Sequence, residues 1–373
     1  MIRIFMTGDN HIGLKYASHE QASVLRSARI DAFPAMVEAA NRENCHLFVI
    51  TGDLFENTYS ISKTDIMQLL NMLSSFRGTV AVLPGNHDFY DKDSKLWQYF
   101  EDVMCSYDNI LLLSEYRPYE LTVNGEAVIL YPALCTSLHS DPGQNNLSWI
   151  RHEKIIPDDT YRIGVAHGAV EGETIDSEGQ YFFMKRSELE SIPVDAWLIG
   201  HTHVPFPNNL TDAFQPCDNI LNAGTHVQTD VACNTDGECF IVEIHEDKTV
   251  YAKKFVSGNL RFFRKNIALS AGSMENTLAR ELDKIEDNSV VDLILSGAVS
   301  AEEYENRTKI IENELSRFIQ GTFNDSNLSR LISKELIDSE FPETSFSAGF
   351  LTALLDDAKE AQLAYELLAS LKD

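Results

Sequence analysis

The sequence predicts an α/β protein with a smaller α+β extension at its C-terminal end. In the first half, short apolar runs rich in β-branched residues alternate with stretches of helical period. After about Ser270 helical patterns dominate. The chain has 373 residues, more than one ordinary compact module needs. We therefore expect one domain over residues 1–268 and a second over residues 269–373.

The chain opens with a β-α-β-α-β order. Apolar strands joined directly by helices indicate a mostly parallel sheet that is covered on both faces. Ligand-binding groups of such a sheet gather in the loops at the carboxyl ends of its strands. The first three expected strands are Ile2–Thr7, His46–Thr51 and Thr79–Leu83, and the helices between them are Gln21–Asn41 and Lys63–Phe76. Further strands are expected at Glu126–Tyr131, Tyr161–Ala166, Ala196–Ile199, Asn219–Asn222, Glu238–Ile244 and Val250–Val256.

The C-terminal extension combines one strand with several helices. Ser289–Leu295 is the expected strand, between helical stretches at Ser273–Glu286 and Ala301–Gln320. Ala348–Lys372 is expected to form a closing helix or helix pair. Residues 271–373 contain 9 Lys and Arg against 21 Asp and Glu, so the extension is acidic.

The net charge and the cysteine pattern indicate how a substrate is attracted and in which compartment the protein works. The net charge of −27 repels polyanions at long range, so a phosphate-bearing substrate must be attracted locally, most simply by bound cations. The six cysteines form no CxxC pair, which is typical of reduced thiols in a cytoplasmic protein. The sequence contains no apolar stretch of the roughly 18 to 20 residues that cross a bilayer, and Met1 leads straight into a strand without a signal peptide. We expect a soluble, cytoplasmic protein that does not enter a membrane.

Five short motifs that are rich in metal-ligand residues follow apolar runs. They are Gly8–His11, Gly52–Glu56, Gly85–Asp88, Ala166–Gly168 and Gly200–His203. Taken singly each is weak, because a lone Asp more often caps a helix and a lone His is more often structural. From these motifs, four His, two Asp and one Asn are available as ligands at five expected strand ends of one sheet, a set that chance rarely assembles.

The residue types predict the chemistry. Oxygen and imidazole ligands without thiolate suit Mn²⁺, Mg²⁺, Fe²⁺ or Zn²⁺ and disfavour a structural zinc site. Seven such groups exceed the needs of one ion. Two ions that share a carboxylate lie roughly 3.5–4 Å apart and hold a bridging hydroxide, the usual arrangement for phosphoester hydrolysis.

In this order and spacing, the motifs resemble the calcineurin-like metallophosphoesterase superfamily over residues 1 to about 260. The resemblance implies a four-layer αββα core. It also implies that one ion is held by Asp9, His11 and His203, the other by Asn86, His167 and His201, with Asp53 bridging the two. His87 then faces the scissile phosphate without binding metal, as a proton donor or charge stabiliser, and Asp88 orients it.

Within the superfamily, Asp53-Leu54-Phe55, the Gly-Asn-His-Asp motif and the α+β tail are most similar to SbcD-type DNA repair exonucleases. Ser289–Ser296 and the helix from Ala301 resemble their capping domain. This similarity implies cleavage of DNA ends with Mn²⁺, a homodimer, and an SMC-like ATPase partner of SbcC type.

Two features of the sequence differ from those expected of a DNA-cleaving enzyme. Glu56 stands where the repair nucleases often carry His or Asp, and its carboxylate would repel a DNA backbone. A basic stripe is also lacking. The candidate substrate-binding cations are Arg261, Arg264 and Lys265, which flank two phenylalanines; the pattern more often belongs to a solvated strand edge. Two alternatives stay open: a small-molecule phosphodiesterase or phosphatase acting on nucleotides, and an inactive scaffold, against which the complete ligand set argues.

Overall fold

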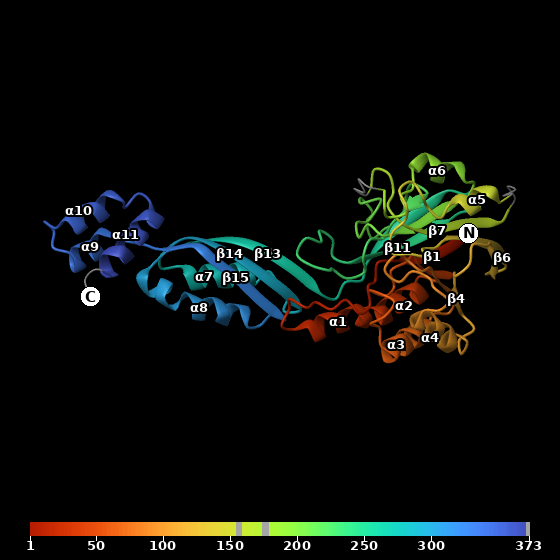
Figure 1. The fold of residues 1–373 in the computed structure, drawn as a ribbon, viewed down its shortest axis with the longest axis horizontal. Coiled ribbons are helices and arrows are strands. Elements are labelled where there is room, and N and C mark those ends of the chain that lie inside the picture. Colours follow the sequence, from red (N-terminus) through yellow and green to blue (C-terminus); the bar gives the residue numbers. More distant parts are fainter. Residues whose placement is uncertain (154–158, 174–178, 371–373) are drawn as a thin grey trace. The chain divides into compact units, whose positions relative to one another are not determined.

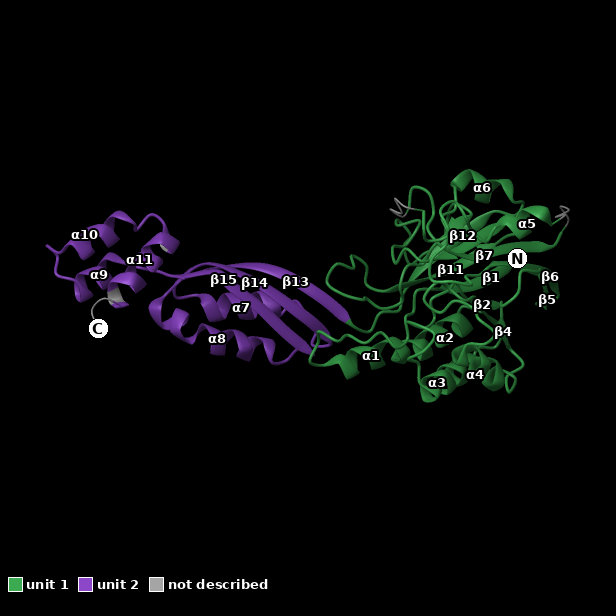
Figure 2. Cartoon of the chain, viewed as in Figure 1, with its two compact units in different colours: residues 1–260 green, residues 261–373 purple. Residues whose placement is uncertain are grey.

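The computed structural model describes residues 1–153, 159–173 and 179–370. The chain forms two compact units, Met1–Leu260 and Arg261–Asp373 (Figure 2). The division falls eight residues before the expected boundary at residue 268. Strand β13 (Arg261–Ser270) pairs along its whole length with β14 (Ser289–Val299), and it therefore belongs to the second unit.

The first unit contains a seven-stranded mixed sheet (Figure 1). Its order is β4-β3-β2-β1-β11-β12-β9; the first four strands are parallel, and β11 runs antiparallel to β1. The strands are β1 (Ile2–Thr7), β2 (Leu47–Ile50), β3 (Thr79–Val82), β4 (Ile110–Leu112), β9 (Gln215–Pro216), β11 (Glu238–Ile244) and β12 (Val250–Val256). The three opening strands of the prediction are confirmed, as are the two at Glu238–Ile244 and Val250–Val256.

A second sheet of five strands packs against the first, in the order β10-β8-β7-β6-β5. Its strands are β5 (Tyr119–Val123), β6 (Glu126–Ala133), β7 (Tyr161–His167), β8 (Ala196–Gly200) and β10 (Ile220–Leu221). Ile4 and Val49 of the first sheet share one buried cluster with Leu130, Val165 and Leu198 of the second. This apolar contact is the main core of the unit.

Helices complete two outer layers. Neighbouring residues of a strand point to opposite faces, so Phe5 and Phe48 turn away from the inter-sheet core and stack on each other at 4.8 Å. The helices that connect the parallel strands are α1 (Ala22–Asp31), α2 (Phe33–Arg42), α3 (Lys63–Ser74) and α4 (Lys95–Met104). On the second sheet, α5 (Ser148–His152) and α6 (Arg186–Ser191) pack Ile150 and Leu189 against Trp197. The four layers confirm the predicted fold class.

The helix expected over residues 21–41 is two helices. The chain breaks at Ala32, which ends α1 and caps α2. Pro34 lies in the first turn of α2, where its missing N–H costs nothing, whereas inside a continuous helix its ring would clash with the preceding turn.

The second unit begins with a βαβαβ arrangement. Its three-stranded parallel sheet has the order β13-β14-β15, with α7 (Met274–Leu282), α8 (Ala301–Leu315) and β15 (Gln320–Arg330) completing the unit. Leu278 and Ile311 of the helices share a buried cluster with Leu293 of the sheet. The expected strand near Ser289 is confirmed; β15 was not expected, because its sequence is polar and only two of its eleven residues are buried.

Three further helices form a separate apolar cluster: α9 (Lys334–Glu340), α10 (Phe346–Ala353) and α11 (Ala358–Ser370). The last two are the helix pair predicted at the C-terminal end. Among the described residues, no helix is both long and apolar enough to cross a membrane.

Candidate dimetal centre

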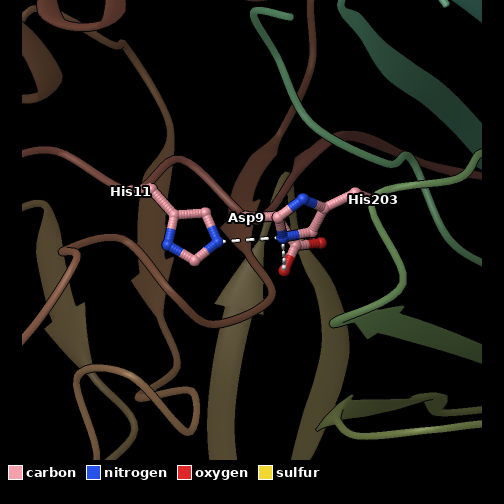
Figure 3. Close-up of side chains that lie close together, drawn as sticks. All are labelled: Asp9, His11 and His203. Carbon is pink, nitrogen blue, oxygen red and sulfur yellow. Dashed lines mark hydrogen bonds and ion pairs between the residues drawn. The ribbon is translucent and has the colours of Figure 1, made fainter. Parts of the chain in front are cut away.

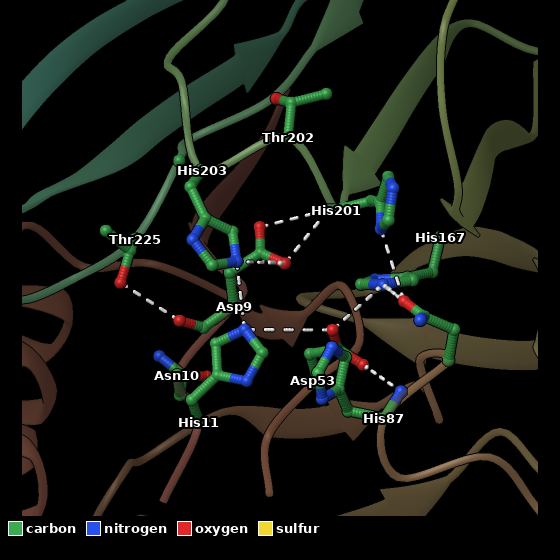
Figure 4. A network of polar contacts seen from close by, with 12 residues as sticks. Asp9, Asn10, His11, Asp53, His87, His167, His201, Thr202, His203 and Thr225 are labelled. Carbon is green, nitrogen blue, oxygen red and sulfur yellow. Dashed lines mark hydrogen bonds and ion pairs between the residues drawn. The ribbon is translucent and has the colours of Figure 1, made fainter. Parts of the chain in front are cut away.

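The five motifs converge on one centre, at the carboxyl ends of β1, β2, β3, β7 and β8 (Figure 4). The prediction that these strands belong to one sheet is wrong: β1, β2 and β3 lie in the seven-stranded sheet, and β7 and β8 in the five-stranded sheet. Strands of each sheet run parallel to their neighbours here, so both groups of loops open in the same region. The centre therefore spans the seam between the two sheets.

The turns that carry these residues have unusual backbone conformations. Five site residues have positive φ: Asp9 (49°), His11 (44°), Asp53 (51°), His201 (114°) and His203 (53°). Such angles are costly for residues with a Cβ, and they persist where surrounding contacts enforce them. Here His11 N donates to Asp53 O at 2.9 Å, and Asp9 N donates to Gly52 O at 3.1 Å.

Gly52 shows why glycine recurs in the motifs. Its φ is +101°, and a Cβ on it would lie 2.2 Å from His167 Nδ1. A larger residue would both strain the turn and displace the imidazole ring.

The first group of ligand-type side chains is Asp9, His11 and His203 (Figure 3). His11 Nε2 lies 2.9 Å from His203 Nε2, and His203 Nε2 lies 3.8 Å from Asp9 Oδ1. The Asp9 carboxylate also accepts hydrogen bonds from the His201 N–H, at 3.0 Å to each oxygen.

The second group brings together Asp53, His167, His201 and Asn86. His167 Nε2 lies 3.3 Å from Asp53 Oδ2 and 3.0 Å from Asn86 Oδ1. Asn86 Oδ1 is also 3.2 Å from His201 Nδ1, while its Nδ2 donates to Leu138 O at 3.3 Å. Asp53 Oδ2 is in addition 3.8 Å from His11 Nε2, so Asp53 lies between the two groups.

The donor set fits divalent cations. A carbonyl oxygen only accepts, so the 2.9 Å contact of His167 Nδ1 with Thr51 O places the proton on Nδ1. In the neutral ring, Nε2 then directs a lone pair at the oxygens of Asp53 and Asn86. Lone pairs that face one another across about 3 Å repel unless a positive charge lies among them, which is the environment of a bound metal ion.

The first group is similar in part. His11 Nδ1 lies 3.0 Å from Glu56 Oε2, an ion-pair contact without hydrogen-bond geometry, and Nε2 faces His203 and Asp53. A carboxylate behind a ligating histidine sets its tautomer and ring orientation. Glu56, which departs from the usual nuclease pattern, thus has a defined contact at this centre.

The pKa shifts of the buried side chains also show that this centre favours positive charge. Burial alone would raise the pKa of Asp53, but the charges of His167, His11 and His87 hold it well below its usual range. Burial would lower the pKa of His167, yet Asp53 raises it to about 9. The pKa of His201 falls to about 4, through burial and then the charge of His167. The Asp53 carboxylate therefore stays ionised and attracts a cation.

His87 lies beside the bridging carboxylate. The backbone N–H of His87 donates to Asp53 Oδ1 at 2.8 Å. The His87 ring contacts the His11 ring edge-to-face, with 4.9 Å between the ring centroids. The Nδ1 atom is 3.1 Å from Glu56 O, which orients the ring. His87, His11 and Asp53 also lie within the mutual distance of a metal-ligand group, so the absence of metal on His87 stays a prediction.

The expected role of Asp88 needs correction. Its carboxylate is fully buried and accepts from Gly85 N at 2.7 Å and from Phe55 N at 3.0 Å, so it joins the second and third motifs through their backbones rather than orienting His87. Burial, followed by the nearby charge of Asp53, raises the pKa of Asp88 to about 7.

The three candidate substrate-binding cations belong to the second unit, on β13. Arg264 Nε donates to Asp292 Oδ2 at 2.7 Å, and Lys265 Nζ donates to Glu281 O at 2.9 Å. Phe262 beside Arg261 is buried, which contradicts a surface grip by its ring. Substrate binding by these cations stays a prediction.

Arg29 is the site-supporting residue that sequence reasoning missed. It is fully buried and donates to the backbone oxygens of Asp9 and Asn10. No local pattern distinguishes it from Arg26, which is exposed on the same helix. His226 is also buried, with Nε2 2.8 Å from Arg29 O.

A cavity of about 400 Å³ opens onto the centre. His11, His87 and His203 line it, together with the carboxylates of Glu56 and Asp230. The lining contains no Lys or Arg among the described residues. A substrate that reaches His87 through this cavity therefore depends on bound cations for its attraction.

The comparison with protein families agrees with this geometry. The family described as Calcineurin-like phosphoesterase matches residues 2–205. A solved dimetal phosphatase from Danio rerio is 12% identical, with a TM-score of 0.38, covering 68% of this chain and 98% of that one. A second solved chain is 9% identical with a TM-score of 0.41 and the same coverage. With more than half of its residues in the family match, this chain belongs to the calcineurin-like phosphoesterase family, which implies a metal-dependent hydrolase with a dimetal site of His and Asp residues.

Proposed function

We propose that the protein hydrolyses DNA phosphodiesters with two divalent cations, as an exo- or endonuclease of SbcD-like type. The observation that best supports hydrolase activity is the position of Asp53 between two groups of nitrogen and oxygen donors, with His87 beside it. One ion would be held by Asp9, His11 and His203, and the other by Asn86, His167 and His201. Bound divalent cations would polarise the phosphoryl oxygens and lower the pKa of a water molecule.

The protein's own side chains supply the remaining steps. Asp53 keeps the two ligand groups together through its contacts with His11 and His167. His87 Nδ1 stays bonded to the Glu56 carbonyl, and Nε2 of the protonated ring can donate to the leaving oxygen. The Glu56 carboxylate lies 3.0 Å from His11 Nδ1 and favours a proton on that atom, which leaves Nε2 free to bind metal.

DNA as substrate is supported by the motif order and by a second unit that combines a sheet with helices. The proposal includes Mn²⁺ as the metal, a homodimer, an SMC-like ATPase partner of SbcC type and a cytoplasmic location. A small nucleotide phosphodiester is the second candidate. The two carboxylates of the cavity and the net charge of −27 favour it, because both repel a polyanion.

One assay separates the candidates. The Mn²⁺-loaded protein is incubated with linear duplex DNA, single-stranded DNA and bis-p-nitrophenyl phosphate, beside a chelator-treated sample. Metal-dependent cleavage of DNA supports the nuclease. Dye release with intact DNA favours the small substrate, and inactivity on every substrate contradicts hydrolysis.

Two substitutions test the site. His87→Ala should lower hydrolysis by about 10²-fold, because a positioned proton donor is lost, while both metals stay bound. His152→Ala, on an exposed histidine of α5, is the matched control. Elemental analysis should show that Asp53→Asn binds less metal, and full occupancy of that variant would exclude the bridging role.

A further inference from the structure

Arg29 is a buried cation next to the candidate dimetal centre. It lies in the last turn of α1, and its side chain is fully buried. Buried arginines are normally paired with carboxylates, because an isolated charge is costly to remove from water. The hydrogen bonds of Arg29 go instead to backbone carbonyls and hydroxyl groups.

These hydrogen bonds join three segments of the chain. The guanidinium donates to Asn10 O at 2.7 Å and to Asp9 O at 3.2 Å. It also donates to Thr225 Oγ1 at 3.1 Å, to Val227 O at 3.2 Å and to Tyr16 OH at 3.3 Å. A planar fork of five N–H groups can serve this many acceptors at once, whereas an ammonium group cannot.

The contacted backbone needs support. Asp9 and His11 flank Asn10, and both have φ in the left-handed region, at 49° and 44°. A non-glycine residue is strained in this region and stays there only where surrounding contacts enforce it. Arg29 donates to the carbonyl groups of the two residues that precede His11. Figure 4 shows the further hydrogen bond from Thr225 Oγ1 to Asp9 O, which measures 3.0 Å.

We propose that Arg29 is a positioning residue that holds the Asp9–His11 turn in ligating geometry and thereby sets the affinity of one of the two cation sites. The inference rests on the proposed dimetal centre. The other site has different supports, since His167 is fixed by Thr51 O and Asn86 by Leu138 O. Loss of Arg29 therefore affects the two sites unequally.

The test is Mn²⁺ binding by isothermal titration calorimetry and elemental analysis, on the full chain carrying Arg29→Lys. The wild type should bind two ions. The variant should bind one of them about 10–100-fold more weakly, the usual effect of a lost supporting contact. The affinity of the other should change much less, because the turn's hydrogen bonds to that site are with backbone groups, the His201 N–H and the Asp53 carbonyl. Hydrolysis should recover at saturating Mn²⁺. Arg26→Lys, on the exposed arginine of the same helix, should leave both affinities unchanged.

Thermal unfolding of the metal-free proteins separates positioning from general stabilisation. A lower melting temperature with both affinities unchanged, or with both reduced equally, would overturn the inference. If Arg29→Lys does not fold, Thr225→Val decides, because it removes only the hydroxyl that Arg29 and Asp9 share and should weaken the same single site. A wild type that binds fewer than two ions would overturn the proposed centre itself.

Discussion

Gly85 offers a direct steric test of the bridging carboxylate. A Cβ at this position would lie 2.2 Å from Asp53 Oδ1 and 2.3 Å from Asp53 N. The φ of Gly85 lies outside the left-handed region, so Gly85→Ala adds a collision without backbone strain. The substitution therefore perturbs Asp53 through one methyl group.

The size of the effect follows from these distances. Non-bonded carbon and oxygen atoms approach to roughly 3.2–3.5 Å, so Asp53 or the Gly85 turn must move by about 1 Å. Asp53 cannot move alone, because its Oδ1 accepts from His87 N and its carbonyl accepts from His11 N. A displacement of this size at a reacting centre lowers the rate by about 10²-fold, and the overpacking costs about 1–3 kcal/mol of unfolding free energy.

The assay combines metal content, hydrolysis of bis-p-nitrophenyl phosphate and chemical denaturation. Gly349→Ala is the control: this glycine lies in α10, and a Cβ there would meet no atom within 4 Å. It should stabilise the helix by up to about 1 kcal/mol without changing hydrolysis. A Gly85→Ala protein with two bound metals and wild-type hydrolysis would refute the geometry proposed for Asp53.

Two acidic residues give further predictions. The Glu303 carboxylate accepts three backbone N–H groups, from Gly272, Met274 and Ser300; although burial raises its pKa, these bonds lower it to about 2. The carboxylate therefore stabilises the fold above pH 4.5, and this stabilisation disappears as the pH falls through 2. In denaturant titrations, Glu303→Gln should lower the unfolding free energy by about 1 kcal/mol at pH 7 and by less at low pH. Glu302→Gln is the control and should not change the unfolding free energy in this way. Glu56→Gln should raise the ratio of DNA cleavage to bis-p-nitrophenyl phosphate hydrolysis about fivefold at saturating Mn²⁺, because about 1 kcal/mol of repulsion is removed; an unchanged ratio would exclude repulsion of DNA by this carboxylate.

Much of the fold follows from local patterns. β1, β11 and β12 coincide with their predicted ranges, because short runs rich in β-branched and aromatic residues favour strands. β15 was not predicted because it is a polar strand without apolar alternation. The assignment of the motif strands to one sheet failed for another reason: a strand pattern does not reveal its pairing partner, which distant segments decide.

Some residues of the candidate site could likewise be predicted from local sequence, and others could not. The order of Asp, His and Asn after apolar runs marked the seven ligand candidates, since each motif is a short stretch of sequence with its own chemistry. The contact of Asp88 with Phe55 N and the burial of Arg29 could not be predicted, because both depend on segments that meet only in the folded chain.

The sequence by itself therefore determined which residues carry the chemistry and where the strands that present them lie, because ligand type and strand propensity are local properties. Only the tertiary structure decided how two sheets join at their carboxyl ends, that Asp53 lies between the two ligand groups, and that a buried arginine supports one of them. The physical reason is that hydrogen bonding and packing between residues nearly 200 positions apart are set by the three-dimensional arrangement, which no local stretch of sequence encodes.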